Sequence, residues 1–497
     1  MSRRGWVFLA LVMLVALLAA MAPERLWAQE PSGWSAPVNL SQSDTASYYP
    51  DVAVDSAGHV YVVWGEFSSD NTGSRPDMLM LRIWDGQAWS AANDIAVGGH
   101  LPQIGVDSRG RLHLLRVGPY TRAWAQGDPL SAQNWTTGRN WFFRSPYWPD
   151  MVVDAQDRIH VVFRDTMEYD EDRTTLERVC MTGCRGIYYV RSVDGGDTWS
   201  NPVQLDAPAG DAEEPRIAVD AQGGVYVVWT DTDASEGAIA IGFSRSTDGG
   251  ETWSVPQQIQ ARSLEVYSDP QIAVDSAGVI HVVWGYRNRN ALGYMMSSDG
   301  GESWSAVETI PMRLTGPYSF GLAVDSADNL HLVGQLAGES IAAGVYHLVR
   351  PRGGSWSPPA LVARIPCSEG AADVELVVSH GNRLHAVWYE RLECELGFVG
   401  PSGRGEIFYS TMTTDAPALP PATLPPMPTP TPAPTPTPAL PTASPTPSPA
   451  VPTWQPAVGA EREATAPALP PPALGIGLSA GVVVVVAVVW SLRRRYQ

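Results

Sequence analysis

Short hydrophobic runs rich in β-branched residues recur along the chain in pairs, and a polar turn of Asp, Ser and Gly separates the two runs of each pair. In the pair at 50–64, the first run ends at Val54 and the second begins at Val60. This pattern predicts a tight hairpin of two strands, called A and B. Copies begin at Pro50, Pro102, Pro149, Pro215, Pro270, Phe320 and Val374.

A second repeated phrase, Ser-x-Asp-Gly-Gly-x-Thr/Ser-Trp-Ser, lies between two further strand-like runs, called C and D. Glycine permits positive φ, the Asp carboxylate can accept backbone N–H groups of a turn, and the Trp can pack between sheets. We therefore expect these residues to form structural turns. They are Ser192, Asp194, Gly196 and Trp199, then Ser246, Asp248, Gly250 and Trp253, and then Ser297, Asp299, Gly301 and Trp304.

Four strands in about 50 residues are typical of one blade of a β-propeller. The repeats predict an all-β domain over 33–412 with seven four-stranded antiparallel blades. The alternative is a six-bladed ring, if the weak second repeat (102–142) is not a blade. The last repeat lacks a strand D, whereas 33–40 resembles one. We expect this N-terminal strand to complete the last blade and to cover its open edge.

The second phrase resembles the Asp-box, or BNR repeat, of sialidase-type β-propellers, and the resemblance implies a fold before it implies a function. Sialidases use three arginines, a Tyr–Glu pair and an Asp acid/base, and their first Arg stands in a Phe/Tyr-Arg-Ile-Pro phrase of the first blade. The corresponding stretch here, 48–51, contains no Arg, and the phrase 364–366 (Arg-Ile-Pro) ends a D strand. No arginine triad or Tyr–Glu pair can be assigned from the sequence.

Two positions of the repeat place charged residues near the loops that join B to C and D to A. The first, just past strand B, carries Glu66, Asp165, Asp231 and Glu390, with Tyr286 in the fifth repeat. The second, after the Pro that opens strand A, carries Asp51, Gln103, Asp150, Arg216, Gln271 and Glu375. We expect both sets at the channel mouth, where they could bind a sugar, hold a cation or supply a carboxylic acid of raised pKa. The competing interpretation is a solvated acidic rim.

The four carboxylates of the first set are the weak catalytic candidates. The ligand-binding candidates are Tyr286, the charged residues of the second set (Asp51, Asp150, Arg216 and Glu375) and several arginines. Arg116, Arg164, Arg287 and Arg391 lie at the ends of B strands and suit an anionic ligand. The long B–C loop at 165–185 is interpreted either as a lid or specificity element or as a tolerated insertion. Five histidines share a strand-B position with two tyrosines, which favours packing over catalysis. They are His113, His160, His281, His331 and His385, with Tyr61 and Tyr226.

Charge and cysteine content narrow the possible partners. The formal net charge is −19, without a basic stripe in the repeats, which excludes nucleic acid as an expected partner. The chain has 4 cysteines, which we expect to form two disulfides in an exported protein. The expected pairs are Cys180 with Cys184 and Cys367 with Cys394. No cofactor or metal site is predicted, and no motif supports a structural calcium ion.

The two ends of the chain indicate export and membrane attachment. Residues 1–29 have the charge and apolar pattern of a signal peptide, with an uncleaved anchor as the alternative. The Pro/Thr-rich stretch 415–472 predicts a disordered linker, and 473–492 predicts one transmembrane helix with a cytoplasmic tail at 493–497. We therefore expect a single-pass membrane protein whose extracellular propeller binds a glycan, a surface polymer or a protein. The alternatives are an exo-acting glycoside hydrolase and a non-catalytic structural or sensor ectodomain.

Overall fold

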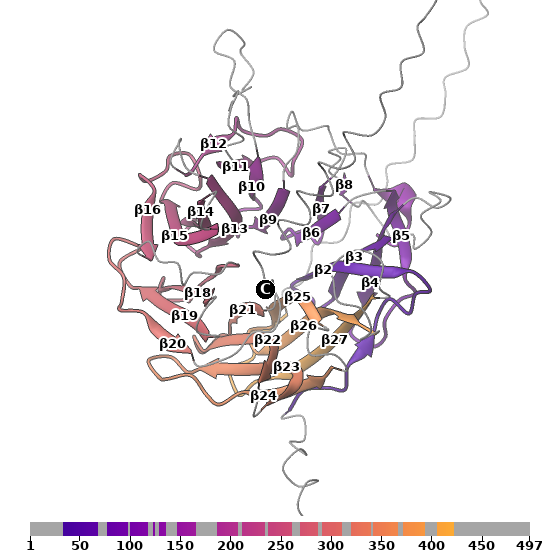
Figure 1. Cartoon of the computed structure of the whole chain (residues 1–497). Coiled ribbons are helices and arrows are strands. Elements are labelled where there is room, and N and C mark those ends of the chain that lie inside the picture. The colour runs from indigo at the N-terminus through magenta and orange to yellow at the C-terminus, as the bar shows by residue number, and fades with distance from the viewer. Residues whose placement is uncertain are drawn as a thin grey trace, which may run out of the picture. The chain divides into compact units, whose positions relative to one another are not determined.

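The described part of the chain is a ring of antiparallel sheets around a central axis (Figure 1). The computed structural model describes 33–67, 77–97, 100–117, 123–124, 129–135, 147–165, 186–206, 211–233, 237–260, 269–286, 291–310, 320–338, 341–365, 371–392 and 405–421. The predicted signal peptide, transmembrane helix and cytoplasmic tail lie outside these residues, as do the linker after Pro421, the loop 166–185, Arg287 and all four cysteines. Within them, no helix is both long and apolar enough to cross a bilayer.

Six sheets have four strands each, in order from the axis outward. Three of them are β2 (Ala46–Val54), β3 (Val60–Phe67), β4 (Met78–Trp84) and β5 (Asn93–Val97); β9 (Tyr147–Val153), β10 (Ile159–Asp165), β11 (Gly186–Ser192) and β12 (Val203–Gln204); and β13 (Asp211–Val219), β14 (Val225–Asp233), β15 (Gly237–Ser246) and β16 (Gln257–Gln260). The other three are β17 (Gln271–Val274), β18 (Ile280–Tyr286), β19 (Ala291–Ser297) and β20 (Glu308–Ile310); β21 (Phe320–Val324), β22 (Leu330–Gly338), β23 (Ile341–Arg350) and β24 (Ala360–Arg364); and β25 (Ala371–Ser379), β26 (Arg383–Arg391), β27 (Gly405–Thr413) and β1 (Val38–Asn39).

The number of complete blades differs from the expected seven. Within the described residues the second repeat forms only a three-stranded sheet of β6 (His100–Val106), β7 (Leu112–Val117) and β8 (Ala123–Trp124). Instead a 3₁₀ helix, η1 (Ala132–Asn134), follows β8, and Trp135 is buried in the same core as Leu112. Within the described residues the ring therefore has six four-stranded blades and one three-stranded sheet, and the expectation of seven four-stranded blades is wrong.

The N-terminal strand closes the last blade, as its resemblance to strand D predicted. Strand β1 pairs antiparallel with β27, with Val38 opposite Tyr409. The Ser35 amide donates to the Thr411 carbonyl at 2.8 Å, and the Leu40 amide donates to the Ile407 carbonyl at 2.7 Å. The edge of the C-terminal sheet is thus covered by residues that lie more than 360 positions away in the chain.

The core lies between neighbouring sheets, where the outward side chains of one blade pack on the next. Tyr226, Val228 and Phe243 of one sheet share a cluster with Ile280 and Trp284 of the next. The Trp at the end of strand B is fully buried in four blades, at Trp64, Trp229, Trp284 and Trp388. Burial of large aromatic side chains between blades stabilises the ring as a whole, because each sheet alone would expose both faces.

In the Asp-box turns, the Ser and Asp side chains form hydrogen bonds with groups of the same turn. In the second copy, the Ser246 hydroxyl donates to Asp248 at 2.7 Å and accepts from the Gly250 amide at 2.8 Å, while the Thr252 hydroxyl donates to Asp248 at 2.6 Å. Hydrogen bonds, first of all from the Ser303 hydroxyl, lower the pKa of Asp299 in the third copy. A carboxylate held in this way has a structural role, as the sequence indicated.

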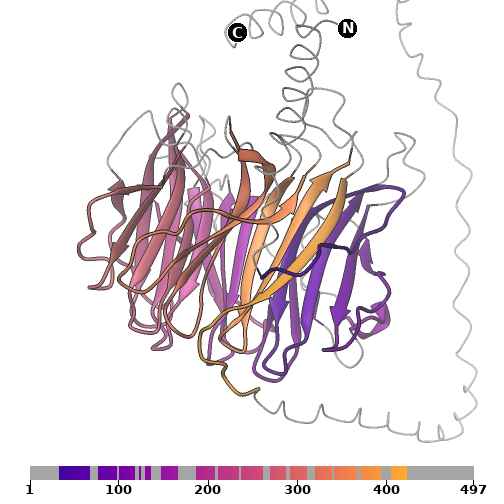
Figure 2. The same ribbon diagram turned by 90° about the horizontal axis from the view of Figure 1, so that it is seen from below.

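The same turns link neighbouring blades. Trp253 packs edge-on against Tyr189 of the preceding blade, with ring centroids 4.6 Å apart. The Arg191 guanidinium donates to the Gly249 carbonyl of the next blade at 2.7 Å. These turns and the A–B turns lie together at one end of the blades (Figure 2), which we call the turn face.

The repeated His/Tyr position of strand B is part of the A–B turn. His160 contacts Asp154 of the turn at 3.0 Å through Nε2 and the Tyr189 hydroxyl of strand C at 2.7 Å through Nδ1. Tyr226 takes the same place in the next blade and donates to Asp220 at 2.7 Å. The predicted packing role of this position is confirmed.

Candidate functional site

The innermost strands open with a repeated backbone irregularity. In six repeats the residue before the Pro or Val that opens strand A has positive φ, although none of these residues is a glycine. The values are 55° at Tyr49, 49° at Leu101, 45° at Trp148, 54° at Glu214, 61° at Asp269 and 50° at Asp373. The pairing register shifts at this point, for example between Glu213 and Arg216, so strand A bulges there. Residues on both sides of the opening position are thereby turned towards the axis.

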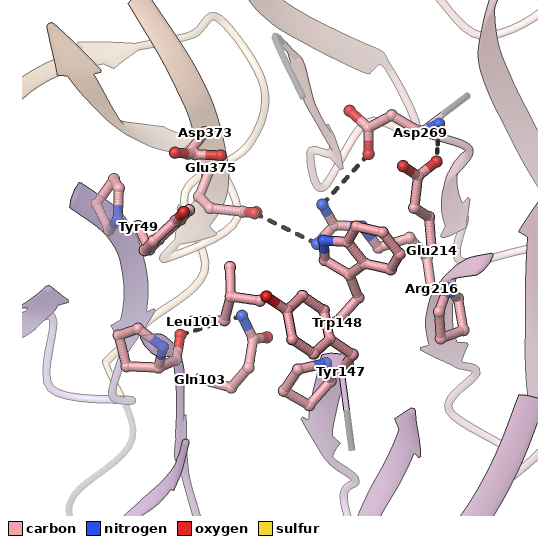
Figure 3. Close-up of a pocket in the computed structure, with 14 residues that line it drawn as sticks. Tyr49, Leu101, Gln103, Tyr147, Trp148, Glu214, Arg216, Asp269, Asp373 and Glu375 are labelled. Carbon is pink, nitrogen blue, oxygen red and sulfur yellow. Dashed lines mark hydrogen bonds and ion pairs between the residues drawn. The ribbon is translucent and has the colours of Figure 1, made fainter. Parts of the chain in front are cut away.

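These residues line a cavity of about 260 Å³ at the axis. Six repeats contribute to the wall, which consists of Tyr49, Pro50, Leu101, Pro102, Gln103, Tyr147, Trp148, Pro149, Glu214, Pro215, Arg216, Asp269, Asp373 and Glu375 (Figure 3). The remaining A strand, β21, has Gly321 at the repeat position that Arg216 and Glu375 occupy. A Cβ there would lie 2.8 Å from the Leu376 amide nitrogen, so the glycine lets β21 approach β25 closely.

Arg216 is the centre of the charged network in the cavity. Its guanidinium lies 3.3 Å from Glu375 Oε1 and 3.4 Å from Asp269 Oδ1 (Figure 3). Against the effect of burial, these two carboxylates raise the pKa of Arg216. The Asp269 amide in turn donates to Glu214 at 2.9 Å. The network therefore joins β13, β25 and the residues that precede β17.

Burial and mutual repulsion raise the pKa values of the carboxyl groups in this network. The pKa of Asp373 rises to about 7, first through burial and then through Glu375 and Asp269. Burial raises the pKa of Asp269 to about 6, although Arg216 opposes the shift. The pKa of Glu375 is also raised, mainly by burial. The cavity consequently holds groups that exchange protons near neutral pH, which is the property expected of a binding or catalytic site.

Two further carboxylates lie behind the wall and tie neighbouring strands together. Asp51 accepts a hydrogen bond from the Ile104 amide at 2.6 Å, and Asp150 accepts one from the Ile217 amide at 2.8 Å. Burial raises the pKa of both. The predicted ligand-binding residues Asp51 and Asp150 are thus near the cavity, and each links its own A strand to the next one.

One side of the cavity is aromatic. The rings of Tyr147 and Trp148 meet edge-on with centroids 5.3 Å apart. The Arg164 guanidinium carbon lies 5.2 Å from the Tyr147 centroid and 4.9 Å from the Trp148 centroid, and its Nη1 donates to Glu213 at 3.2 Å. Across the cavity, burial and then Asp373 raise the pKa of Tyr49 to about 12.

The strand-B carboxylates lie elsewhere, and none of the described ones lines the cavity. Glu66, Asp231 and Glu390 accept hydrogen bonds from the indole of the Trp two residues earlier, at 3.0, 2.6 and 3.4 Å. Burial raises the pKa of Glu390 to about 7. Asp165 is buried, and Tyr286 packs against Trp284 with centroids 5.9 Å apart. Of the second repeat position, Gln103, Arg216 and Glu375 line the cavity, whereas the described residues of the first position do not.

The predicted arginine cluster is distributed over separate blades. Arg116 donates to the Val97 carbonyl, and burial lowers its pKa. Arg164 contacts Glu213 and the two aromatic rings of the wall, and Arg391 ends β26. None of these three arginines lines the cavity.

The residues before the opening position were not predicted from the sequence. Tyr49, Trp148, Glu214, Asp269 and Asp373 lie one or two residues from the predicted set, and all of them line the cavity. An indication was present, because four of these five immediately precede the Pro of their repeat. Among the described residues, no group of three or more His, Cys, Asp or Glu side chains could hold a metal ion.

Comparison with solved structures gives the fold. A protein of unknown function from Dyadobacter fermentans matches with a TM-score of 0.50 and 13% identity, over 77% of this chain and 100% of its own. The Hadza microbial sialidase Hz136 matches with a TM-score of 0.44 and 15% identity, over 75% of this chain and 66% of its own. The polysaccharide lyase Uly1 matches with a TM-score of 0.47 and 11% identity, over 76% of this chain and 91% of its own. The described residues form a β-propeller, and sialidases are among the solved structures that resemble it. At these identities the likeness concerns the fold alone.

No family model and no curated protein sequence matches the chain. The arginine triad that the sialidase resemblance implies has no counterpart among the described cavity residues, where Arg216 is the one arginine. The chemistry of the cavity itself must therefore indicate the function.

Proposed function

We propose that the chain is an exported, membrane-anchored propeller that binds a glycan through the axial cavity. The observation that carries the proposal is the composition of that wall, which combines aromatic rings with carboxylate, guanidinium and amide groups from six repeats. A sugar offers hydroxyl donors and acceptors to such polar groups, and its ring carbons pack on aromatic faces. A surface polymer or a protein loop of similar chemistry is the other ligand class of this proposal.

A glycan array probed with the detergent-purified full chain tests this function. We expect a defined set of glycans to bind, and Glu375→Gln to weaken binding about tenfold because a charged hydrogen-bond acceptor is lost. Asp197→Asn is the matched control, since it removes the same charge from an exposed residue of an Asp-box turn. Absence of any ligand on the array and in a surface-polymer pull-down would leave the structural or sensor role as the better explanation.

Hydrolysis is the second candidate because Asp373 has a raised pKa and lies beside Glu375 and Tyr49 in one cavity. Glycosidases pair a protonated carboxylic acid with an ionised group on the other side of the sugar. Release of product from fluorogenic sialosides or other glycosides, abolished by Asp373→Asn, would favour the hydrolase over the binding protein.

A further inference from the structure

We propose that the ligand of the axial cavity carries a positively charged amine, and that its chemical class is a glycan with unacetylated amino sugars. This inference rests on the proposed glycan-binding function and goes further by naming the charge of the ligand. It is the opposite of the anionic sugar that the sialidase resemblance implies.

The first argument is the balance of charge. The wall contains four carboxyl groups, those of Glu214, Asp269, Asp373 and Glu375, and a single cation, Arg216. Arg216 already forms ion pairs with Asp269 and Glu375. An anionic ligand would have to compete with Asp269 and Glu375 for this guanidinium, whereas a cation would favour the ionised forms of the carboxyl groups.

The second argument is an unused acceptor. Asp269 is only 3% exposed, and its Oδ1 accepts hydrogen bonds from Gln271 at 3.1 Å and from Arg216 at 3.4 Å. Its other oxygen, Oδ2, has no hydrogen-bond partner. A buried carboxylate oxygen without a donor is unfavourable, and an ammonium group supplies three donors together with the compensating charge. A ligand ammonium group that displaces Arg216 or moves Asp269 would supply such a donor.

The third argument is the aromatic side of the cavity. Aromatic faces attract cations, and the rings of Tyr147 and Trp148 already pack against one, the Arg164 guanidinium. The cavity volume of about 260 Å³ is at the small end of ligand sites, so it suits one sugar-sized group at the end of a chain.

The test compares three hexasaccharides, a sialylated trisaccharide and a cationic peptide. The detergent-purified full chain is titrated calorimetrically at pH 5.5 with the glucosamine hexamer, the N-acetylglucosamine hexamer, a neutral glucose hexamer, sialyllactose and pentalysine. We expect the glucosamine hexamer to bind at least tenfold more tightly than each of the others. Tighter binding of an acetylated, neutral or sialylated glycan would overturn the amine inference but keep the glycan-binding function. Equal binding of pentalysine would overturn the sugar class, and no binding of any glycan would overturn both.

Variants and proton release supply independent readouts. Asp269→Asn should weaken glucosamine binding at least tenfold, with Asp197→Asn as the control. If Asp269→Asn fails to fold, the comparison of ligands with the unsubstituted chain still tests the charge of the ligand. A bound ammonium favours the ionised forms of Asp269, Asp373 and Glu375, which face one another and Arg216, Glu214, Asp51 and Asp150. Titration in two buffers of different ionisation enthalpy should therefore report proton release at pH 5.5, and binding without release would contradict the proposal.

Discussion

At the scale of single residues, the axial cavity concentrates two costs in one place. A left-handed backbone at a non-glycine residue is unfavourable by about 1–2 kcal/mol, and here it recurs at Tyr49, Glu214 and Asp269 among others. Buried carboxyl groups of raised pKa are also unfavourable in their ionised form. Strain and buried charge that coincide at one cavity are the features expected of a binding site.

The raised pKa of Asp373 gives a prediction about stability. In the unfolded chain an Asp titrates near 3.9, whereas in the fold Asp373 titrates near 7. The folded state therefore binds the extra proton, so this group stabilises the fold below about pH 4, and that contribution is lost as the pH rises through about 7. Asp373→Asn should raise Tm at pH 8 by about 2–4 °C and leave Tm at pH 4 nearly unchanged.

Thermal unfolding by circular dichroism at both pH values measures this effect. Asp197→Asn serves again as control, because an exposed carboxylate should have little influence at either pH. A fall in Tm of Asp373→Asn at pH 8 would show that the ionised carboxylate stabilises the fold and would contradict the assigned environment.

At the scale of elements, the Asp-box hairpins act between blades as well as within them. Gly250 has φ of 85°, and a Cβ there would lie 1.8 Å from the Tyr189 hydroxyl of the neighbouring blade. Gly278 has a similar φ of 79° in an A–B turn, but nothing lies within 4 Å of its Cβ position. A comparison of substitutions at Gly250 and Gly278 therefore distinguishes the cost of backbone strain from the cost of a clash between blades.

Alanine substitution at the two glycines should therefore differ in cost. Gly278→Ala should lower the free energy of unfolding by about 1 kcal/mol through backbone strain, and Gly250→Ala should cost about 1–3 kcal/mol more through overpacking. Urea denaturation followed by tryptophan fluorescence gives both values. Equal costs at the two positions would mean that the Asp-box turn does not press on the next blade.

The hairpins were predictable from sequence because their chemistry is local. Asp55, Asp154 and Asp248 each bond to backbone amides within four residues, so the turn is visible in a short stretch of chain. The cavity was only partly predictable because it joins residues from six repeats. The repeats made Glu66 and Asp231 site candidates just as they did Arg216, at a different position. Only the structure shows that each of these carboxylates accepts a hydrogen bond from a Trp on its own strand. The incomplete second repeat also needed the structure, since its apolar pattern still resembles a hairpin.

At the scale of the whole molecule, the net charge of the chain and most of the charged groups of the cavity have the same sign. The formal net charge of −19 creates a field that attracts cations to the surface, and the cavity presents carboxylates at the axis. Both favour a cationic ligand whose association slows as salt is added.

We predict that the C-terminal apolar run attaches the whole molecule to a membrane. Deletion of 473–497 should release the chain into the medium, because the apolar run 473–492 and the arginines after it would no longer hold it in a bilayer. Immunoblots of membrane and medium fractions measure the distribution, and Arg493→Gln is the control that keeps the apolar run. Retention of the deleted chain in the membrane fraction would assign the anchor to residues 1–29.

The described ends of the ring have a mechanical consequence. Gly33 lies against Met412 near the turn face, and the segment after β27 runs beneath that face (Figure 2), where the Leu419 amide donates to the His380 carbonyl and the Thr414 amide donates to the Asn382 carbonyl, both at 2.8 Å. Tension on the C-terminal side would first load these contacts. It would then pull β27 along its own length, against hydrogen bonds to β1 and β26 that must break together. In such shear geometry the closing blade would resist tension applied through the C-terminal side.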